Sequence, residues 1–310
     1  MDFRLTDDQK ALKAGVRELL EGRFGREALR AAVDSQVLDR GLWRDLGAAG
    51  FFALRLPEEA GGVGLGLPEA VLVFEEAGRV LLPGPLIATH LAAGSVDGAA
   101  EGEVVVTAVD GGLVEWLEAA DVVLGDVTGA VAVRSVDPLT PLHRVPGPVV
   151  AGRSERNAPA GAPSRVPTRP ALRDDCPHGA VLLTAAEQLG SASRTTEMAV
   201  AYARNREQFG QAVGAFQAVK HLCAEMLVRT EVARAAVYGA AVTADPVEIA
   251  GAKLLADEAA VQCARDCLQV HGGMGFTWEA DVHLHLKRAW VRAERGLTRA
   301  RAEEMEAAAL

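Results

Sequence analysis

The sequence has few aromatic residues, no dense basic patch and no long uncharged apolar run. Phe, Trp and Tyr make up only 5% of its 310 residues, so the 49% apolar share rests on small and aliphatic side chains, which favours closely packed helices. A net charge of −10 without clustered Lys or Arg argues against nucleic acid as a partner. No stretch approaches 18 uninterrupted apolar residues, and the acidic N-terminus lacks a signal-peptide core. We therefore expect a cytoplasmic chain without a membrane span.

Cysteine is scarce, and its spacing gives no metal site. Cys263 and Cys267 lie four residues apart in a helical pattern, as a pair of metal ligands would, but no further His or Cys follows at ligand spacing. Small buried thiols are common in cytosolic cores, so we interpret the pair as packing and predict no metal. The glycines of residues 61–66 do not have G-x-G-x-x-G spacing, so a Rossmann phosphate loop is not expected either.

The order of helical and extended patterns predicts an α+β, mostly helical chain in three parts. Residues 1–100 form an N-terminal helical domain that opens with a capping box from Thr6 to Gln9. Residues 101–177 form a reduced β domain followed, from 151, by a Pro- and Arg-rich linker, and residues 178–310 form a helical bundle. Strands are expected at 104–106, 122–124 and 131–133, and bundle helices at 178–202, 215–243, 246–271 and 279–308.

Two C-terminal stretches combine residues that suit ligand binding. The first, R-N-R-E-Q-F-G-Q-A-V-G-A-F-Q from Arg204 to Gln217, leaves one helix, turns at two glycines and enters the next helix. An Arg, a Gln and an aromatic residue at such a junction can hold a phosphate and stack on a planar ring, although an ordinary interhelical turn explains them equally well. The second, Q-V-H-G-G-M-G-F-T-W-E from Gln269 to Glu279, has paired glycines that let a backbone approach a ligand, or simply end a helix.

The N-terminal part carries L-P-E-E-A-G-G at 56–62 and F-E-E-A-G-R at 74–79, on a helix expected to leave Glu75 and Glu76 facing solvent. Taken in order, these segments and the two C-terminal stretches resemble signatures of the acyl-CoA dehydrogenase family. The family patterns are P-E-x-x-G-G, E-E-x-G-[RS], R-x-x-F-G…F-Q and Q-x-x-G-G-x-G-[FY]. The resemblance covers about 1–100 and 178–292, which is most of the chain.

This resemblance implies an N-terminal helical domain, a central β domain and a C-terminal four-helix bundle, with FAD bound at a subunit interface. Family members desaturate an acyl-CoA thioester between its α and β carbons. A carboxylate removes the α-proton, hydride passes to the flavin, and an electron-transfer flavoprotein accepts the electrons. Matched position by position, the implied FAD contacts are Arg206, Gln208, Phe209, Gln217, Gln269, Gly272 and Gly273.

Two parts of the family pattern are missing. Residues 85–177 contain no T-E-x-x-x-G-S-D-like segment of the kind that holds the flavin ring, and the expected strands are too few for a closed barrel. The usual position of the catalytic Glu falls on Gly296, and the alternative position on the first bundle helix falls on Ala180. On a continuous helix Glu294 would be rotated by about 200° from position 296. We therefore assign no catalytic residue, and we interpret the nearby carboxylates as structural or solvated: Glu187, Glu294, Asp174 and Asp175.

A chain with distal FAD contacts but no base resembles the short subunit of heterotetrameric (α₂β₂) actinobacterial acyl-CoA dehydrogenases that act on steroid side chains. The resemblance implies a larger partner subunit that supplies the base and most of the flavin pocket, a bulky acyl-CoA substrate and an electron-transfer flavoprotein. The reduced β domain leaves room for such a substrate. Three alternatives stay open: a self-sufficient homo-oligomer with a relocated base such as Glu187 or Glu294, a non-catalytic scaffold subunit, and a helical binding module unrelated to flavins.

Overall fold

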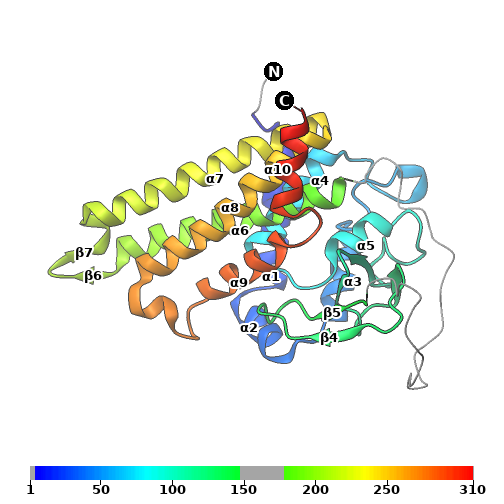
Figure 1. Cartoon of the computed structure of the whole chain (residues 1–310), viewed down its shortest axis with the longest axis horizontal. Helices are drawn as coiled ribbons and strands as arrows, with labels where there is room; N and C mark the ends of the chain where they lie inside the picture. The colour runs from blue at the N-terminus through cyan, green and yellow to red at the C-terminus, as the bar shows by residue number, and fades with distance from the viewer. Residues whose placement is uncertain (1–3, 147–177, 310) are drawn as a thin grey trace.

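The computed structural model describes residues 4–146 and 178–309, and most of them are helical (Figure 1). The first helix begins where the capping box predicts: the N–H of Gln9 donates to Thr6 Oγ1 (3.2 Å), and the N–H of Thr6 donates to Gln9 Oε1 (3.1 Å). The N-terminal elements are α1 (Asp7–Arg23), α2 (Arg26–Ser35), α3 (Arg40–Ala48), the 3₁₀ turn η1 (Glu58–Ala60), α4 (Leu67–Arg79) and α5 (Leu86–Ala92).

A small open sheet follows, with strand order β3-β1-β2-β5-β4. Only the β1–β3 pair is parallel. The expected strands at 122–124 and 131–133 are confirmed. The first strand begins later than expected because the N–H of Val104 donates to the carbonyl of Gly98 (3.0 Å) in a turn. The strands are β1 (Val106–Asp110), β2 (Leu113–Glu115), β3 (Val122–Leu124), β4 (Val131–Val133) and β5 (Leu142–Arg144).

Long helices make up the C-terminal part, in which α6 packs on α8 and α8 packs on α7. In Figure 1 they run side by side, with the sheet and α5 at the opposite end of the molecule from the β6–β7 hairpin. No helix within 4–146 or 178–309 is long and apolar enough to cross a membrane. The elements are α6 (Gly179–Asn205), β6 (Glu207–Gln208), β7 (Gln211–Ala212), η2 (Val213–Ala215), α7 (Gln217–Thr243), α8 (Pro246–His271), η3 (Gly272–Phe276), α9 (Val282–Ala293) and α10 (Arg299–Ala309).

The single helix expected over 279–308 is wrong, because α9 and α10 are separated by residues 294–298. Gly296 has φ +70°, which lies outside the right-handed helical region. A carboxylate on the sheet holds this break in place: Asp110 Oδ2 accepts the N–H of Gly296 (2.7 Å) and Nε of Arg295 (3.0 Å). The contact joins partners about 185 residues apart, so a pattern of local helical spacing does not reveal it.

Glu75 and Glu76 do not face solvent as expected; both are buried in α4. Glu75 pairs with Lys13 of α1 (2.5 Å) and with Arg234 of α7. Burial alone would raise the pKa of Glu75, but Lys13 and Arg234 outweigh it and the pKa is lowered. Glu76 pairs with Arg17 of α1 (2.8 Å). The sequence pattern predicted exposed carboxylates because most of their counter-ions lie on α1 and α7, which are distant in sequence. Arg79 of α4 itself also pairs with Glu76.

Two glycines bring the backbones of α4 and α6 into contact. A Cβ on Gly78 would lie 2.0 Å from the carbonyl oxygen of Glu187, and one on Gly190 would lie 1.9 Å from that of Glu75. No side chain fits at these separations. The glycine of the E-E-A-G-R segment is therefore required by packing, and it sets the position of the N-terminal helices on the bundle.

The predicted linker at 151–177, with Asp174, Asp175 and Cys176, lies outside the described residues, which resume at His178. The division into domains at 1–100, 101–177 and 178–310 stays a prediction.

We expect Gly190→Ala to lower the free energy of unfolding by about 3 kcal/mol, because its methyl group would overlap the carbonyl of Glu75. Gly239→Ala is the matched control, since a Cβ at that position in α7 meets no atom within 4 Å. It should raise the free energy of unfolding by up to about 1 kcal/mol, the difference in helix propensity. Urea denaturation of both variants checks this, and a stable Gly190→Ala protein would contradict the close α4–α6 contact.

Candidate functional site

The two C-terminal stretches singled out in the sequence meet at one end of the bundle. The ring of Tyr202, one turn before the end of α6, stacks on the ring of His271 at the end of α8, with centroids 4.1 Å apart and planes inclined by 25°. The Tyr202 hydroxyl also donates to the carbonyl of His271 (3.4 Å). The stack therefore joins Arg206, which caps α6, to the turn that begins at Gly272.

A tight hairpin carries the first stretch beyond the end of the helices (Figure 1). Its two turn residues, Phe209 and Gly210, have φ +55° and +78°, as in a type I′ turn. A left-handed backbone costs a residue with a side chain about 1 kcal/mol, and the Phe209 side chain is 91% exposed. Within the described residues the Phe209 ring makes an edge-to-face contact with the Phe216 ring (centroids 6.1 Å apart) and stays largely open to solvent, so it is available to a ligand.

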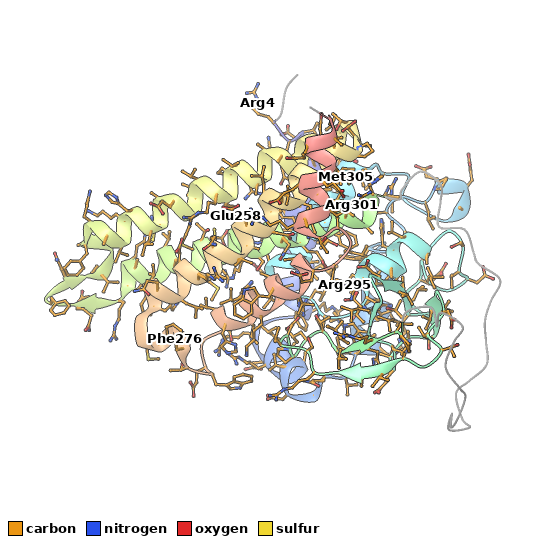
Figure 2. All side chains as sticks on the ribbon, in the orientation of Figure 1. Arg4, Glu258, Phe276, Arg295, Arg301 and Met305 are labelled. Atoms are coloured by element: carbon orange, nitrogen blue, oxygen red, sulfur yellow. The ribbon has the colours of Figure 1, made fainter. Side chains whose placement is uncertain are left out.

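The second stretch presents bare backbone. Gly272 ends α8 with φ +57° and ψ −139°, and a Cβ on Gly272 or on Gly273 would meet no atom within 4 Å. Gln269 lies exposed on the preceding turn of α8, and the Phe276 side chain is 76% exposed beyond it. Figure 2 places Phe276 at the periphery of the molecule. The glycine pair ends the helix as predicted, and it leaves peptide groups open to a ligand.

Together these residues form an open surface at the end of the bundle. Arg206 is exposed, and within the described part of the chain its side chain makes no ion pair; Gln217, the first residue of α7, is exposed as well. A guanidinium suits a phosphate, an exposed Phe suits a planar ring, and the exposed backbone of Gly273 can face oxygen atoms, whereas the N–H of Gly272 already donates to the carbonyl of Gln269. These donors fit the adenine and pyrophosphate part of FAD. Nothing from the sheet reaches this end of the molecule (Figure 1).

The two positions at which a base was sought lie together at the other end of α6. A Cβ on Gly296 would be 3.5 Å from Val181 Cγ2, and Val181 follows Ala180. Helix α6 has 27 residues and therefore spans about 40 Å, with Ala180 at its start and Arg206 at its end. Within one chain, the candidate FAD-contact surface (Arg206, Phe209, Gln269 and the Gly272–Gly273 turn) and the base position therefore lie toward opposite ends of α6.

Glu187 is the acidic residue of α6 nearest this region, and it is buried in an ion pair. Its Oε2 lies 2.9 Å from Nη2 of Arg292 on α9. Burial raises the pKa of Glu187 and lowers the pKa of Arg292 to about 10, because both charges have left water. This arrangement supports a structural role for Glu187, as the sequence predicted.

Glu294 is exposed and caps the end of α9. The helical rotation of about 200° that separated it from position 296 does not apply, because Gly296 lies outside the helix. Asp110 and Arg295 were not predicted from the sequence; their hydrogen bond joins the sheet to the loop after α9 (Figure 2 labels Arg295). The Asp-Gly-Gly turn after a Val-rich strand was the one available signal for Asp110.

Cys263 and Cys267 are buried between helices. Sγ of Cys263 lies 3.8 Å from the Thr230 hydroxyl, Sγ of Cys267 lies 3.6 Å from Nδ1 of His271, and burial raises the pKa of both thiols. Across 4–146 and 178–309, no group of three or more His, Cys, Asp or Glu side chains could hold a metal ion.

Comparison with known proteins identifies the family. The N-terminal domain of acyl-CoA dehydrogenases matches residues 6–100, and their C-terminal domain matches residues 180–296. The acyl-CoA dehydrogenase IpdE2 of Mycobacterium tuberculosis is 37% identical over 295 residues, which cover 91% of each chain. The chain belongs to the acyl-CoA dehydrogenase family. It is thus an oxidoreductase chain of the class that acts on a CH–CH bond of acyl-CoA.

Solved structures of this acyl-CoA dehydrogenase fold include heteromeric ones. A chain of the ChsE4–ChsE5 complex from Mycobacterium tuberculosis superposes with a TM-score of 0.79 at 23% identity, over 100% of this chain and 98% of that chain. A variant of the Tcur3481–Tcur3483 steroid acyl-CoA dehydrogenase superposes with a TM-score of 0.80 at 22% identity, over 97% of each chain.

We expect Glu187→Gln to lower the free energy of unfolding by about 3 to 5 kcal/mol, because it leaves the buried Arg292 without its counter-ion. Replacing both partners, as Glu187→Leu with Arg292→Met, should recover part of that loss. Glu294→Gln is the control and should change stability by less than about 0.5 kcal/mol, since Glu294 is exposed. Urea denaturation of the four proteins gives the comparison, and a harmless Glu187→Gln would rule out the structural role.

Proposed function

We propose that this chain is the short subunit of a heteromeric, FAD-dependent acyl-CoA dehydrogenase, and that a larger partner supplies the catalytic base. The observation that carries the proposal is the separation along α6: one end presents FAD-compatible groups, and the other end has Gly296 and Ala180 where a base is expected. A site that uses the first end must be completed by another subunit. The two-component names of the structural relatives agree with this arrangement.

In the proposed site, Arg206 holds the pyrophosphate of FAD and Phe209 stacks on a planar ring. Gln217, Gln269 and the Gly272–Gly273 backbone donate or accept hydrogen bonds around them. These exposed groups are already held in place by the hairpin and by the Tyr202–His271 stack, so little ordering is needed when the partner docks. Bound FAD would accept a hydride from the β carbon, and the partner's carboxylate would take the α-proton.

We further propose a bulky acyl-CoA, of the steroid side-chain type, as the substrate of the complex, and an electron-transfer flavoprotein as its oxidant. Among the described residues the sheet has five short strands and does not close into a barrel, and a reduced β domain of this kind would leave room for a bulky acyl group. One structural relative is named as a steroid acyl-CoA dehydrogenase, which supports the same substrate class.

Flavin content tests the FAD contacts. In the complex with the partner we expect Arg206→Ala to lose most of its FAD, because a charge-assisted hydrogen bond to phosphate is removed. Arg204→Ala is the matched control: Arg204 is exposed, lies two residues earlier and should leave the absorbance near 450 nm unchanged. Phe209→Asn should keep or improve hairpin stability, since Asn favours the left-handed turn, yet weaken FAD binding. Retained FAD in Arg206→Ala and Phe209→Asn would favour a scaffold role.

The assembly itself is tested by expressing the chain alone and together with a larger acyl-CoA dehydrogenase subunit. We expect only the co-expressed complex to be yellow, with about half as many flavins as chains, because each FAD needs one contact surface from each kind of subunit. Mass photometry and flavin absorbance give both numbers. A yellow, active homo-oligomer of this chain alone would refute the shared site and return attention to a base within the chain.

A further inference from the structure

A second polar site lies away from the FAD-contact surface, where α1, α2, α4, α6 and α9 converge. It is a cavity of about 190 Å³. That volume equals about six water molecules at about 30 Å³ each, and it is smaller than the roughly 300 Å³ at which cofactor and drug pockets begin. Neither FAD nor acyl-CoA fits inside it. Its polar lining residues are Arg17, Glu21, Arg26, Glu76, Arg79, Arg194, Asp281 and His285.

The lining carries four guanidinium groups and three carboxylates, of which Glu21 is one, and one of the guanidinium groups is weakly paired. Glu76 is already shared by Arg17 and Arg79. Asp281 is likewise shared by Arg26 and Arg30. Among the described residues, Arg194, which is 48% exposed, reaches only Glu197 at 3.7 Å, and that carboxylate makes two hydrogen bonds to Arg79 (2.7 and 2.9 Å). Arg194 therefore retains donors and positive charge at the mouth of the cavity.

The start of α2 adds a second source of positive potential. Gly25 is the N-cap residue of this ten-residue helix, lines the cavity and has no side chain to bond the first peptide N–H groups. Most helices place a Ser, Thr, Asp or Asn at this position, as α3 does with Asp39. An uncapped helix start is a favourable place for an oxygen-bearing anion.

A buried imidazole completes the lining. His285 is 3% exposed and uses Nδ1 in its hydrogen bond with the Ser191 hydroxyl (2.8 Å), while its Nε2 has no partner among the described residues. Burial lowers the pKa of His285 to about 3, so the ring is neutral at pH 7. When Ser191 donates to Nδ1, the ring carries its proton on Nε2 and can donate a hydrogen bond.

We propose that this cavity binds a small oxyanion, either inorganic phosphate or a carboxylate of similar size, through Arg194, the N-terminus of α2 and His285. This inference does not depend on the proposed function, because the cavity is separate from the FAD-contact surface.

Isothermal titration calorimetry of the purified chain, in whatever assembly it forms, at constant ionic strength, with inorganic phosphate and then with succinate, tests the site. We expect saturable binding of one anion per chain, and the tighter of the two identifies the class. Arg194→Met should weaken binding about tenfold, the effect of one charged hydrogen bond. Arg134→Met, an exposed residue far along the chain after β4, is the control and should not change the affinity.

Gly25→Asp separates binding from folding. The backbone at Gly25 has φ −72° and ψ −176°, which Asp adopts readily, and an added Cβ meets only the carbonyl of Glu21 at 3.5 Å. The new carboxylate should cap α2 and raise the melting temperature while it abolishes anion binding by charge repulsion. Absence of saturable heat with both anions, or unchanged affinity in Arg194→Met and Gly25→Asp, would overturn the proposal.

Discussion

The contact between α4 and α6 determines where the other parts of the molecule lie. Gly78 and Gly190 let the two backbones touch, and α4 then presents Glu75 and Glu76 to cations from α1, α4 itself and α7. A carboxylate buried at such a seam is stable only when several counter-ions surround it. The N-terminal helices are thus held on the bundle by ion pairs around a small-residue contact, with little need for large aromatic side chains.

Helix α6 extends in both directions from its contact with α4, and its length separates two regions of the molecule. At its end, the Tyr202–His271 stack aligns the hairpin and the glycine turn into one exposed surface. At its start, the loop after α9 is tied to the sheet by Asp110. Between these two ends, Glu187 forms a buried ion pair with Arg292. The chain therefore presents an open surface at one end of α6 and a charge-paired region toward the other.

The sequence predicted the elements that depend on local spacing. The three long bundle helices, the Thr6 capping box and the helix end at Gly272 follow from caps, glycines and apolar periodicity, so they were confirmed. The buried positions of Glu75 and Glu76, and the break at Gly296, depend on partners far away in the chain. Residue spacing carries little information about such pairs, so the predictions of exposed Glu75 and Glu76 and of one continuous helix over 279–308 were wrong. The FAD contacts were predicted from the order of sequence motifs, and the structure brings those residues to one surface. Their contact with FAD stays a prediction.

The left-handed backbone at Gly296 also bears on how the loop could be engineered. A glutamate introduced there would have to adopt φ +70°, at a cost of about 1 kcal/mol, beside a peptide N–H already bound to Asp110. The contact with Asp110 fixes the path of the loop, so a new side chain at this position would start from a direction that the sheet has set.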